Sequence, residues 1–149
     1  MNRHTATVRL LISKGADIMI PNNDGNIALH LACQNGHQEI AYLLLNASTQ
    51  NNSTTNLDIC NITGERGDSP LHFACCAGNI SVINLLISCG VNINSRNDDQ
   101  VLPLHFSAYY NHIDNITPLL LHGADSGESD HIGTNILHIA CEKGHFELL

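Results

Sequence analysis

Aromatic residues are scarce in this chain. It contains no tryptophan, and phenylalanine and tyrosine together make up 4% of its 149 residues. Rings therefore cannot build most of the interior. Hydrophobic residues still amount to 43% of the chain, which is enough for it to fold. We expect one domain whose core consists of leucine, isoleucine, valine, alanine and cysteine side chains.

Basic residues are also few. The chain has 6 lysines and arginines against 14 aspartates and glutamates, a formal net charge of −8. Nucleic-acid binding depends on cationic side chains that neutralise phosphates, so we expect no nucleic-acid partner. The acidic balance instead favours a soluble protein and a protein partner that carries basic groups.

Long apolar runs are missing as well. No stretch approaches the roughly 20 apolar residues that cross a membrane, and polar residues 2–4 follow the first methionine in place of an apolar leader. We therefore expect no membrane contact and a cytoplasmic location, with the nucleus as an alternative.

Sequence motifs of catalysis and metal binding do not occur. The chain has no C-x-x-C, H-E-x-x-H, G-x-S-x-G or phosphate-binding Gly-Lys-Ser/Thr motif. The acidic pair Asp98-Asp99 falls at an expected turn, where solvated charges are common. We predict no catalytic residue, cofactor or metal. A redox or metal-dependent activity built on the 6 cysteines and 10 histidines remains an alternative.

The chain is organised around residues 67–90. Ser69 and Pro70 can begin a helix, since Ser is a good N-cap and Pro is tolerated in the first turn. Gly78 can end it, because glycine enters the left-handed region without steric cost. A second, strongly apolar helix over residues 80–87 follows. Such a unit cannot bury its own apolar face and needs neighbouring copies of itself.

The chain supplies these copies. A Leu-His pair recurs with its histidine at positions 30, 72, 105 and 138, so the intervals are 42, 33 and 33 residues. A period of 33 with a T-P-L-H-x-A signature is that of ankyrin repeats. The signature stands here as Ile27-Ala28-Leu29-His30-Leu31-Ala32, Ser69-Pro70-Leu71-His72-Phe73-Ala74, Leu102-Pro103-Leu104-His105-Phe106-Ser107 and Asn135-Ile136-Leu137-His138-Ile139-Ala140.

Other offsets repeat together with the Leu-His pair, namely Gly-His at residues 36–37 and 144–145 and Gly-Ala-Asp at residues 15–17 and 123–125. The chain therefore resembles the ankyrin-repeat family over essentially its whole length. The resemblance implies an all-α solenoid of stacked helix-turn-helix units with β-turn fingers. It also implies a non-catalytic module for protein–protein interaction. The signature histidines, which the resemblance ties to backbone and hydroxyl groups near the turn, should lie about 10 Å apart in successive units and cannot share a metal.

We place a partial repeat at residues 1–20, with a second helix over 5–13. Repeats follow at 21–56, 57–89 and 90–122, and an incomplete repeat at 123–149. Residues 48–56 are uncharged and polar, so we expect a flexible surface loop there, either a neutral insertion or a binding or modification loop. The incomplete repeats leave apolar ends that favour self-association. They also favour the alternative that the chain is a piece of a larger scaffold, channel or enzyme.

Two residues depart from the repeat pattern, and three cysteines follow it. Asn111 replaces the turn glycine of the other repeats, which a left-handed asparagine can do. Pro118 stands where the preceding repeat has Leu85, so we expect a kinked or late-starting helix. Cys33, Cys75 and Cys141 follow the signature Ala or its equivalent, and we expect reduced, buried cysteines there.

The family resemblance also implies where a partner binds, at the finger tips and at the exposed ends of the first helices. The tip positions are Asn23, Asp24, Asn26, Glu65, Arg66, Asp68, Asp98, Asp99, Val101, His131, Ile132 and Thr134. The first-helix positions are Gln34, Asn35, Cys76, Ala77, Tyr109, Tyr110, Glu142 and Lys143. We expect Tyr109 and Tyr110 to be the anchors inside an acidic rim, because tyrosine is enriched at interface hot spots. The alternative is that one of the two rings packs on the neighbouring repeat.

Overall fold

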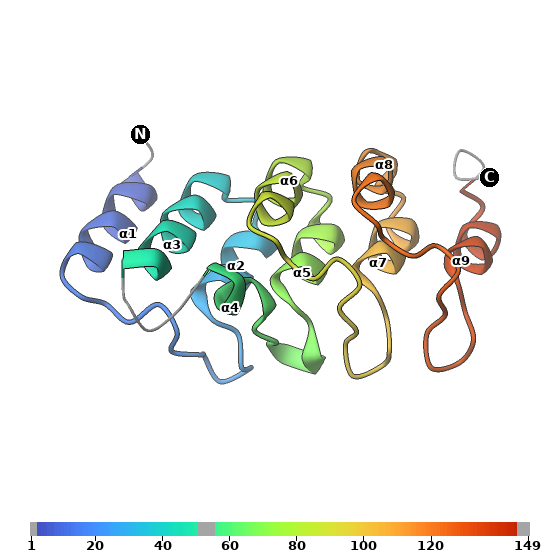
Figure 1. Cartoon of the computed structure of the whole chain (residues 1–149), viewed down its shortest axis with the longest axis horizontal. Coiled ribbons are helices and arrows are strands. Elements are labelled where there is room, and N and C mark those ends of the chain that lie inside the picture. Colours follow the sequence, from blue (N-terminus) through green and yellow to red (C-terminus); the bar gives the residue numbers. More distant parts are fainter. Residues whose placement is uncertain (1–2, 51–55, 146–149) are drawn as a thin grey trace.

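The computed structural model describes residues 3–50 and 56–145. Figure 1 shows a row of helix pairs along the long axis, with the two ends of the chain at opposite ends of the row and loops projecting along one edge. The prediction of an all-α solenoid of helix-turn-helix units is confirmed. Among the described residues, no helix has both the length and the apolar character needed to cross a membrane.

The helices form two layers (Figure 1). The first helices of the repeats are α2 (Ala28–Gln34), α5 (Pro70–Ala77), α7 (Pro103–Tyr109) and α9 (Ile136–Lys143), and each packs on the next. The second layer contains α1 (Arg3–Ser13), α3 (Gln38–Gln50), α6 (Ile80–Ser88) and α8 (Ile113–Leu121). A short helix, α4 (Asn56–Asn61), and a 3-10 turn, η1 (Glu65–Gly67), connect α3 to α5.

The core runs continuously between the two layers and is aliphatic with buried cysteines, as predicted. Leu71, Ala74 and Cys75 of α5 are fully buried, and so are Val82, Ile83 and Leu86 of α6. Because each repeat buries its apolar face against the next, the fold gains its stability from stacking.

The expected ends of the first helices are observed. Ser69 is the N-cap of α5, and Gly78 ends that helix in the left-handed conformation with φ of 73°. Asn111 takes the same role after α7, with φ of 57°. The asparagine therefore replaces the turn glycine as predicted, since Asn is among the few residues that tolerate this region.

The described cysteines are all free thiols, but they differ in burial. Cys33, Cys60 and Cys75 are buried. Burial raises the pKa of Cys60 and of Cys75 to about 12, which leaves both thiols neutral and weakly nucleophilic near pH 7. The expectation that Cys141 is buried is wrong, since it is exposed. No second helix packs behind α9 in the described part of the chain, whereas α3 and α6 cover the corresponding sides of α2 and α5.

The expected loop over residues 48–56 is wrong at both of its ends. Residues 48–50 belong to α3, and Asn56 begins α4. Ser48 is fully buried and its hydroxyl donates to the carbonyl oxygen of Leu45 at 2.7 Å. This local bond satisfies the hydroxyl within the helix, so a polar sequence continues as helix. Residues 51–55 lie outside the described residues.

Of the two alternatives expected for the helix that contains Pro118, a kink or a late start, the late start is wrong. Helix α8 begins at Ile113, 33 residues after the start of α6 at Ile80, and continues through Pro118 to Leu121. Proline removes one backbone donor, and the remaining turns and the burial of Ile116 and Leu119 keep the segment helical.

Candidate functional site

The fingers are the turns that precede the first helices, at residues 64–68, 97–101 and 130–134. They are joined to one another through their backbones. The amide of Asp98 donates to the carbonyl oxygen of Arg66 at 3.0 Å, and the amide of His131 donates to that of Asp99 at 3.2 Å. The approach is close at Gly67, where a Cβ atom would lie 2.9 Å from the amide nitrogen of Asp98. The fingers of successive repeats therefore form one connected edge.

Two side chains shape the fingers on either side of α7. The Oδ1 atom of Asn97 accepts from the amides of Asp99 and Val101 at 3.1 and 2.8 Å. Asp130 Oδ1 does the same with the amides of Ile132 and Thr134, at 3.0 and 2.8 Å. Such Asx turns hold a tight finger without a glycine at every position.

Three of the signature histidines, His30, His72 and His105, connect their repeat to the next. In His72, Nδ1 accepts from the amide of Ser69 and Nε2–H donates to the carbonyl oxygen of Val101, both at 3.0 Å. His30 and His105 make the same two kinds of bond one repeat earlier and one later. The structural role implied for the signature histidines is confirmed for these three, whereas His138 is exposed and bonds to Asn135 in its own repeat. Burial lowers the pKa of His72 to about 4, so its ring is neutral.

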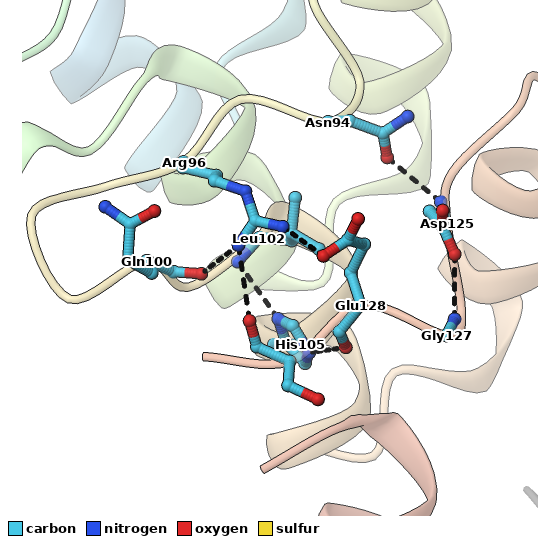
Figure 2. A network of polar contacts seen from close by, with 9 residues as sticks. Asn94, Arg96, Gln100, Leu102, His105, Asp125, Gly127 and Glu128 are labelled. Atoms are coloured by element: carbon cyan, nitrogen blue, oxygen red, sulfur yellow. Dashed lines mark hydrogen bonds and ion pairs between the residues drawn. The ribbon is translucent and has the colours of Figure 1, made fainter. Parts of the chain in front are cut away.

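Arg96 connects the finger at residues 97–101 to residues 128–129 of the next repeat, as Figure 2 shows. Its guanidinium pairs with the carboxylate of Glu128 and donates to the carbonyl oxygens of Gln100 and Ser129, both at 3.2 Å. Nearby, the side chain of Asn94 accepts from the amide of Asp125 at 2.9 Å. Polar contacts that bridge residues 94–100 and 125–129 thus fix the finger position.

The fingers and first helices line an open hollow of about 450 Å³ over α7 and α9. Its apolar side chains are Val101, Phe106, Ile132 and Ile139, together with the rings of Tyr109 and Tyr110. Its charged side chains are Arg66, Asp99, Asp130 and Glu142. Asn97, His105 and Thr134 complete the lining. The hollow is therefore apolar at its walls and carries three carboxylates against one guanidinium.

The two tyrosines lie together at the end of α7. Each is 47% exposed, and their rings meet edge to face with centroids 5.0 Å apart. The ammonium of Lys143 lies 4.2 Å from the centroid of the Tyr109 ring. Tyr110 stacks on His112, and a hydrogen bond with the thiol of Cys76 in the preceding repeat raises the pKa of its hydroxyl. Tyr110 thus packs on its neighbours and is still half exposed.

The hollow brings together eight of the residues expected to bind a partner: Arg66, Asp99, Val101, Tyr109, Tyr110, Ile132, Thr134 and Glu142. The others lie outside its lining: Asn23, Asp24, Asn26, Gln34, Asn35, Glu65, Asp68, Cys76, Ala77, Asp98, His131 and Lys143. Lys143 nevertheless reaches the Tyr109 ring. Asp98 is exposed at its fingertip.

Two of the expected tip residues hold the frame. Asn26 was expected at an exposed tip, but it is 5% exposed and its Oδ1 accepts from the amide of Glu65 at 2.9 Å. Asp68 is half-buried and accepts from the side chain of Asn97 at 2.8 Å. Desolvation raises the pKa of the Asp68 carboxyl. Both side chains therefore connect neighbouring fingers.

Sequence reasoning missed five lining residues: Asn97, His105, Phe106, Asp130 and Ile139. A signal for two of them was present. Asn97 and Asp130 are 33 residues apart, and each precedes a fingertip by one or two residues, where Asx turns are favoured. Within residues 3–50 and 56–145, no three histidine, cysteine, aspartate or glutamate side chains gather as a metal site would need.

Comparison with known proteins identifies the repeats. The family model for ankyrin repeats, in three copies, matches residues 1–56 and 48–130. The chain belongs to the ankyrin-repeat family. Ankyrin repeats are protein-interaction modules, and such a module is typically non-catalytic.

The ankyrin-repeat chain is similar to segments of much larger proteins. It is 34% identical over 142 residues to transient receptor potential cation channel subfamily A member 1 of Homo sapiens, covering 93% of this chain and 12% of that protein. It is 35% identical over 124 residues to E3 ubiquitin-protein ligase KEG of Arabidopsis thaliana, covering 82% and 7%. It is 31% identical over 150 residues to nuclear factor NF-kappa-B p105 subunit of Gallus gallus, covering 99% and 15%. The chain thus spans a small part of the length of these relatives.

Proposed function

We propose that this ankyrin-repeat chain binds a protein partner without catalysing a reaction, and that the hollow over α7 and α9 is the centre of the interface. The observation that carries the proposal is the pair Tyr109 and Tyr110, two half-exposed rings in contact at 5.0 Å inside an acidic hollow. Exposed tyrosine pairs of this kind supply large contact area at low entropic cost and are common anchors of interfaces.

The charges of the hollow favour a partner with basic groups. Arg66 is paired with Asp99 at 3.0 Å, so the carboxylates of Asp130 and Glu142 are in excess at the lining. An acidic rim around apolar anchors attracts basic surfaces and repels acidic ones, which speeds association and improves specificity.

The proposal extends to a larger protein that contains this chain and to its cellular compartment. Relatives that are far longer than this chain support a role as the partner-binding part of a larger scaffold, channel or enzyme whose activity lies elsewhere. We also propose a cytoplasmic location, with the nucleus as an alternative, because the free thiols of the described cysteines are compatible with a reducing compartment.

The test is capture of a partner from the source cell, with chemical cross-linking to identify the contacting residues. Substituting Tyr109→Ala together with Tyr110→Ala should weaken capture by about 30-fold or more, because truncating an anchor typically costs above ~2 kcal/mol. Tyr42→Ala is the matched control, since Tyr42 is 54% exposed on α3 in the other helix layer. The helical circular dichroism signal should be the same for all variants.

A second arm tests the acidic rim. Asp98→Asn with Asp99→Asn should weaken capture mainly at low salt, because rim charges act on the association rate and are screened by ions. If the tyrosine pair can be removed with no loss of capture, the hollow is not the interface. Residues 48–56 then become the next segment to test.

A further inference from the structure

We propose that the hollow receives a lysine side chain of the partner on the ring face of Tyr109, and that Lys143 of the chain itself is a built-in competitor for that face. The inference rests on the proposed function and specifies what the partner must present. It follows from a cation that already occupies the aromatic site, from the carboxylates around it and from the apolar walls below them.

The first observation is the position of Lys143. It is the last residue of α9, and its ammonium lies 4.2 Å from the Tyr109 centroid. Within the described part of the chain, this ammonium forms no ion pair within 4.0 Å. The face of the Tyr109 ring is the contact that the structure shows for this ammonium among the described residues. An ammonium over a tyrosine face is stabilised by the ring quadrupole, so the structure displays the chemistry that a partner's lysine would use.

The second observation is the excess of carboxylates. Asp99, Asp130 and Glu142 line the same hollow as Tyr109, against the single guanidinium of Arg66. Arg66 is engaged by Asp99, and Asp130 is held in place by two backbone amides. A second ammonium entering the hollow would therefore meet fixed negative charge as well as an aromatic face.

The third observation is the shape of the lining. Phe106 and Ile139 come from the first helices, and Val101 and Ile132 come from the fingers. Lysine buries its methylene stem against apolar surface while keeping its charged tip near polar groups. A hollow of about 450 Å³ falls within the roughly 300–1,000 Å³ of small-ligand sites. It has room for one long side chain together with flanking backbone.

The exposed end of α9 makes Lys143 easy to displace. Its side chain is exposed, and a surface cation–π contact is worth only a small amount of free energy. A partner's lysine that also reaches the carboxylates can replace it. Lys143 therefore lowers the affinity of the hollow for an isolated lysine. A partner segment that makes additional contacts with the hollow can still bind there.

The experiment is a titration by NMR, following the ring protons of the three tyrosines. The probes are three blocked tripeptides that differ only in the central residue: Gly-Lys-Gly, Gly-Arg-Gly and Gly-norleucine-Gly. Norleucine has an aliphatic chain like that of lysine without the ammonium. The lysine peptide should shift the rings of Tyr109 and Tyr110, leave Tyr42 unchanged and bind more tightly than the other two.

Lys143→Met tests the competitor. Removing the ammonium while keeping a flexible apolar chain should lower the dissociation constant of the lysine peptide by about two- to fivefold, the equivalent of an exposed cation–π contact. Lys14→Met is the control, since it changes net charge by the same amount from an exposed position after α1, at the other end of the row of helices. Lys14→Met should leave the dissociation constant unchanged, and both variants should match the parent in thermal unfolding.

Three results would overturn the inference. Equal binding of the norleucine peptide would make the hollow an apolar site. Tighter binding of the arginine peptide would assign the site to a guanidinium. An unchanged or weaker affinity of Lys143→Met would remove the competitor. These failures are distinguishable from failure of the proposed function, because partner capture by the tyrosine variants is measured separately and can be lost while no tripeptide binds.

Discussion

His72 and Val101 are joined across two repeats by a 3.0 Å hydrogen bond from Nε2–H of the ring to the backbone carbonyl. The other ring nitrogen of His72 accepts from the amide of Ser69 at 3.0 Å. A proton on Nδ1 would convert this acceptor into a donor and break the bond that orients the ring. The neutral histidine therefore couples the start of α5 to the finger of the next repeat.

This hydrogen-bonded coupling predicts that the free energy of unfolding decreases as the pH is lowered. Burial lowers the pKa of His72 to about 4 from 6.5 in the unfolded chain, and burial likewise lowers the pKa of His30 and His105. The unfolded chain binds more protons between these values, so the stabilisation is complete above pH 6.5 and is lost as the pH falls towards 4. His72 alone should account for up to about 3 kcal/mol of this loss.

Urea unfolding at pH 7.5 and at pH 5 measures the effect. The free energy of unfolding should be clearly smaller at pH 5, and His138→Gln should leave that difference in place. His138 occupies the same signature position but is exposed. Equal stability at the two pH values would contradict the assigned role of the buried histidines.

Asn115→Val should stabilise the protein. Asn115 is 1% exposed, and neither its Oδ1 nor its Nδ2 has a hydrogen-bond partner among the described residues. The corresponding residue of α6 is the fully buried Val82. Removing an unsatisfied buried amide should raise the free energy of unfolding by about 1–3 kcal/mol. Asn84→Val, at an exposed position of α6, is the control. A lower urea midpoint for Asn115→Val would show that the amide has a structural partner.

Pro118→Leu should also stabilise the third repeat. Helix α8 runs through Pro118, so the carbonyl of Asp114 lacks the amide donor that a leucine would restore. Leu85 occupies the equivalent position in α6. We expect a gain on the order of 1–3 kcal/mol, reduced if neighbours have adapted to the ring. Chemical denaturation checks it, and a decrease would mean that the proline is required where it stands.

Self-association is expected at the exposed apolar ends of the solenoid. Leu137 is 56% exposed although its counterpart Leu104 is buried, and Leu10 and Leu11 of α1 are more than half exposed. Sedimentation velocity should show larger species as concentration rises. Leu137→Gln should reduce them more than Leu121→Gln, which alters an exposed residue of α8. A strict monomer over the whole range would contradict the expectation. Leu148, an apolar residue of the incomplete last repeat, lies outside the described residues.

The repeat, its helices and its turns were predictable because they depend on local chemistry at fixed offsets. The N-cap at Ser69 and the left-handed turns at Gly78 and Asn111 are of this kind. The hollow was only half predictable. Tyr109 follows from an offset within one repeat, whereas Asp130 joins it only through contacts between fingers.

The errors in the sequence prediction have the same origin. Asn26 looks like a tip residue in its own repeat, yet its side chain holds the next finger. Cys141 follows the pattern of a buried residue, but its burial needs a helix behind α9 that the described residues do not include. Ser48 was expected in a loop because polarity alone does not reveal a hydroxyl that bonds back within a helix.

Tyrosine footprinting tests the binding surface without any substitution. The three tyrosines are all about half exposed, with Tyr109 and Tyr110 in the hollow and Tyr42 on α3. Tyrosine-selective nitration, read by mass spectrometry, should label all three in the free protein. With the captured partner bound, Tyr109 and Tyr110 should be protected while Tyr42 is labelled as before. Undiminished labelling of Tyr109 and Tyr110 in the complex would place the interface elsewhere on the solenoid.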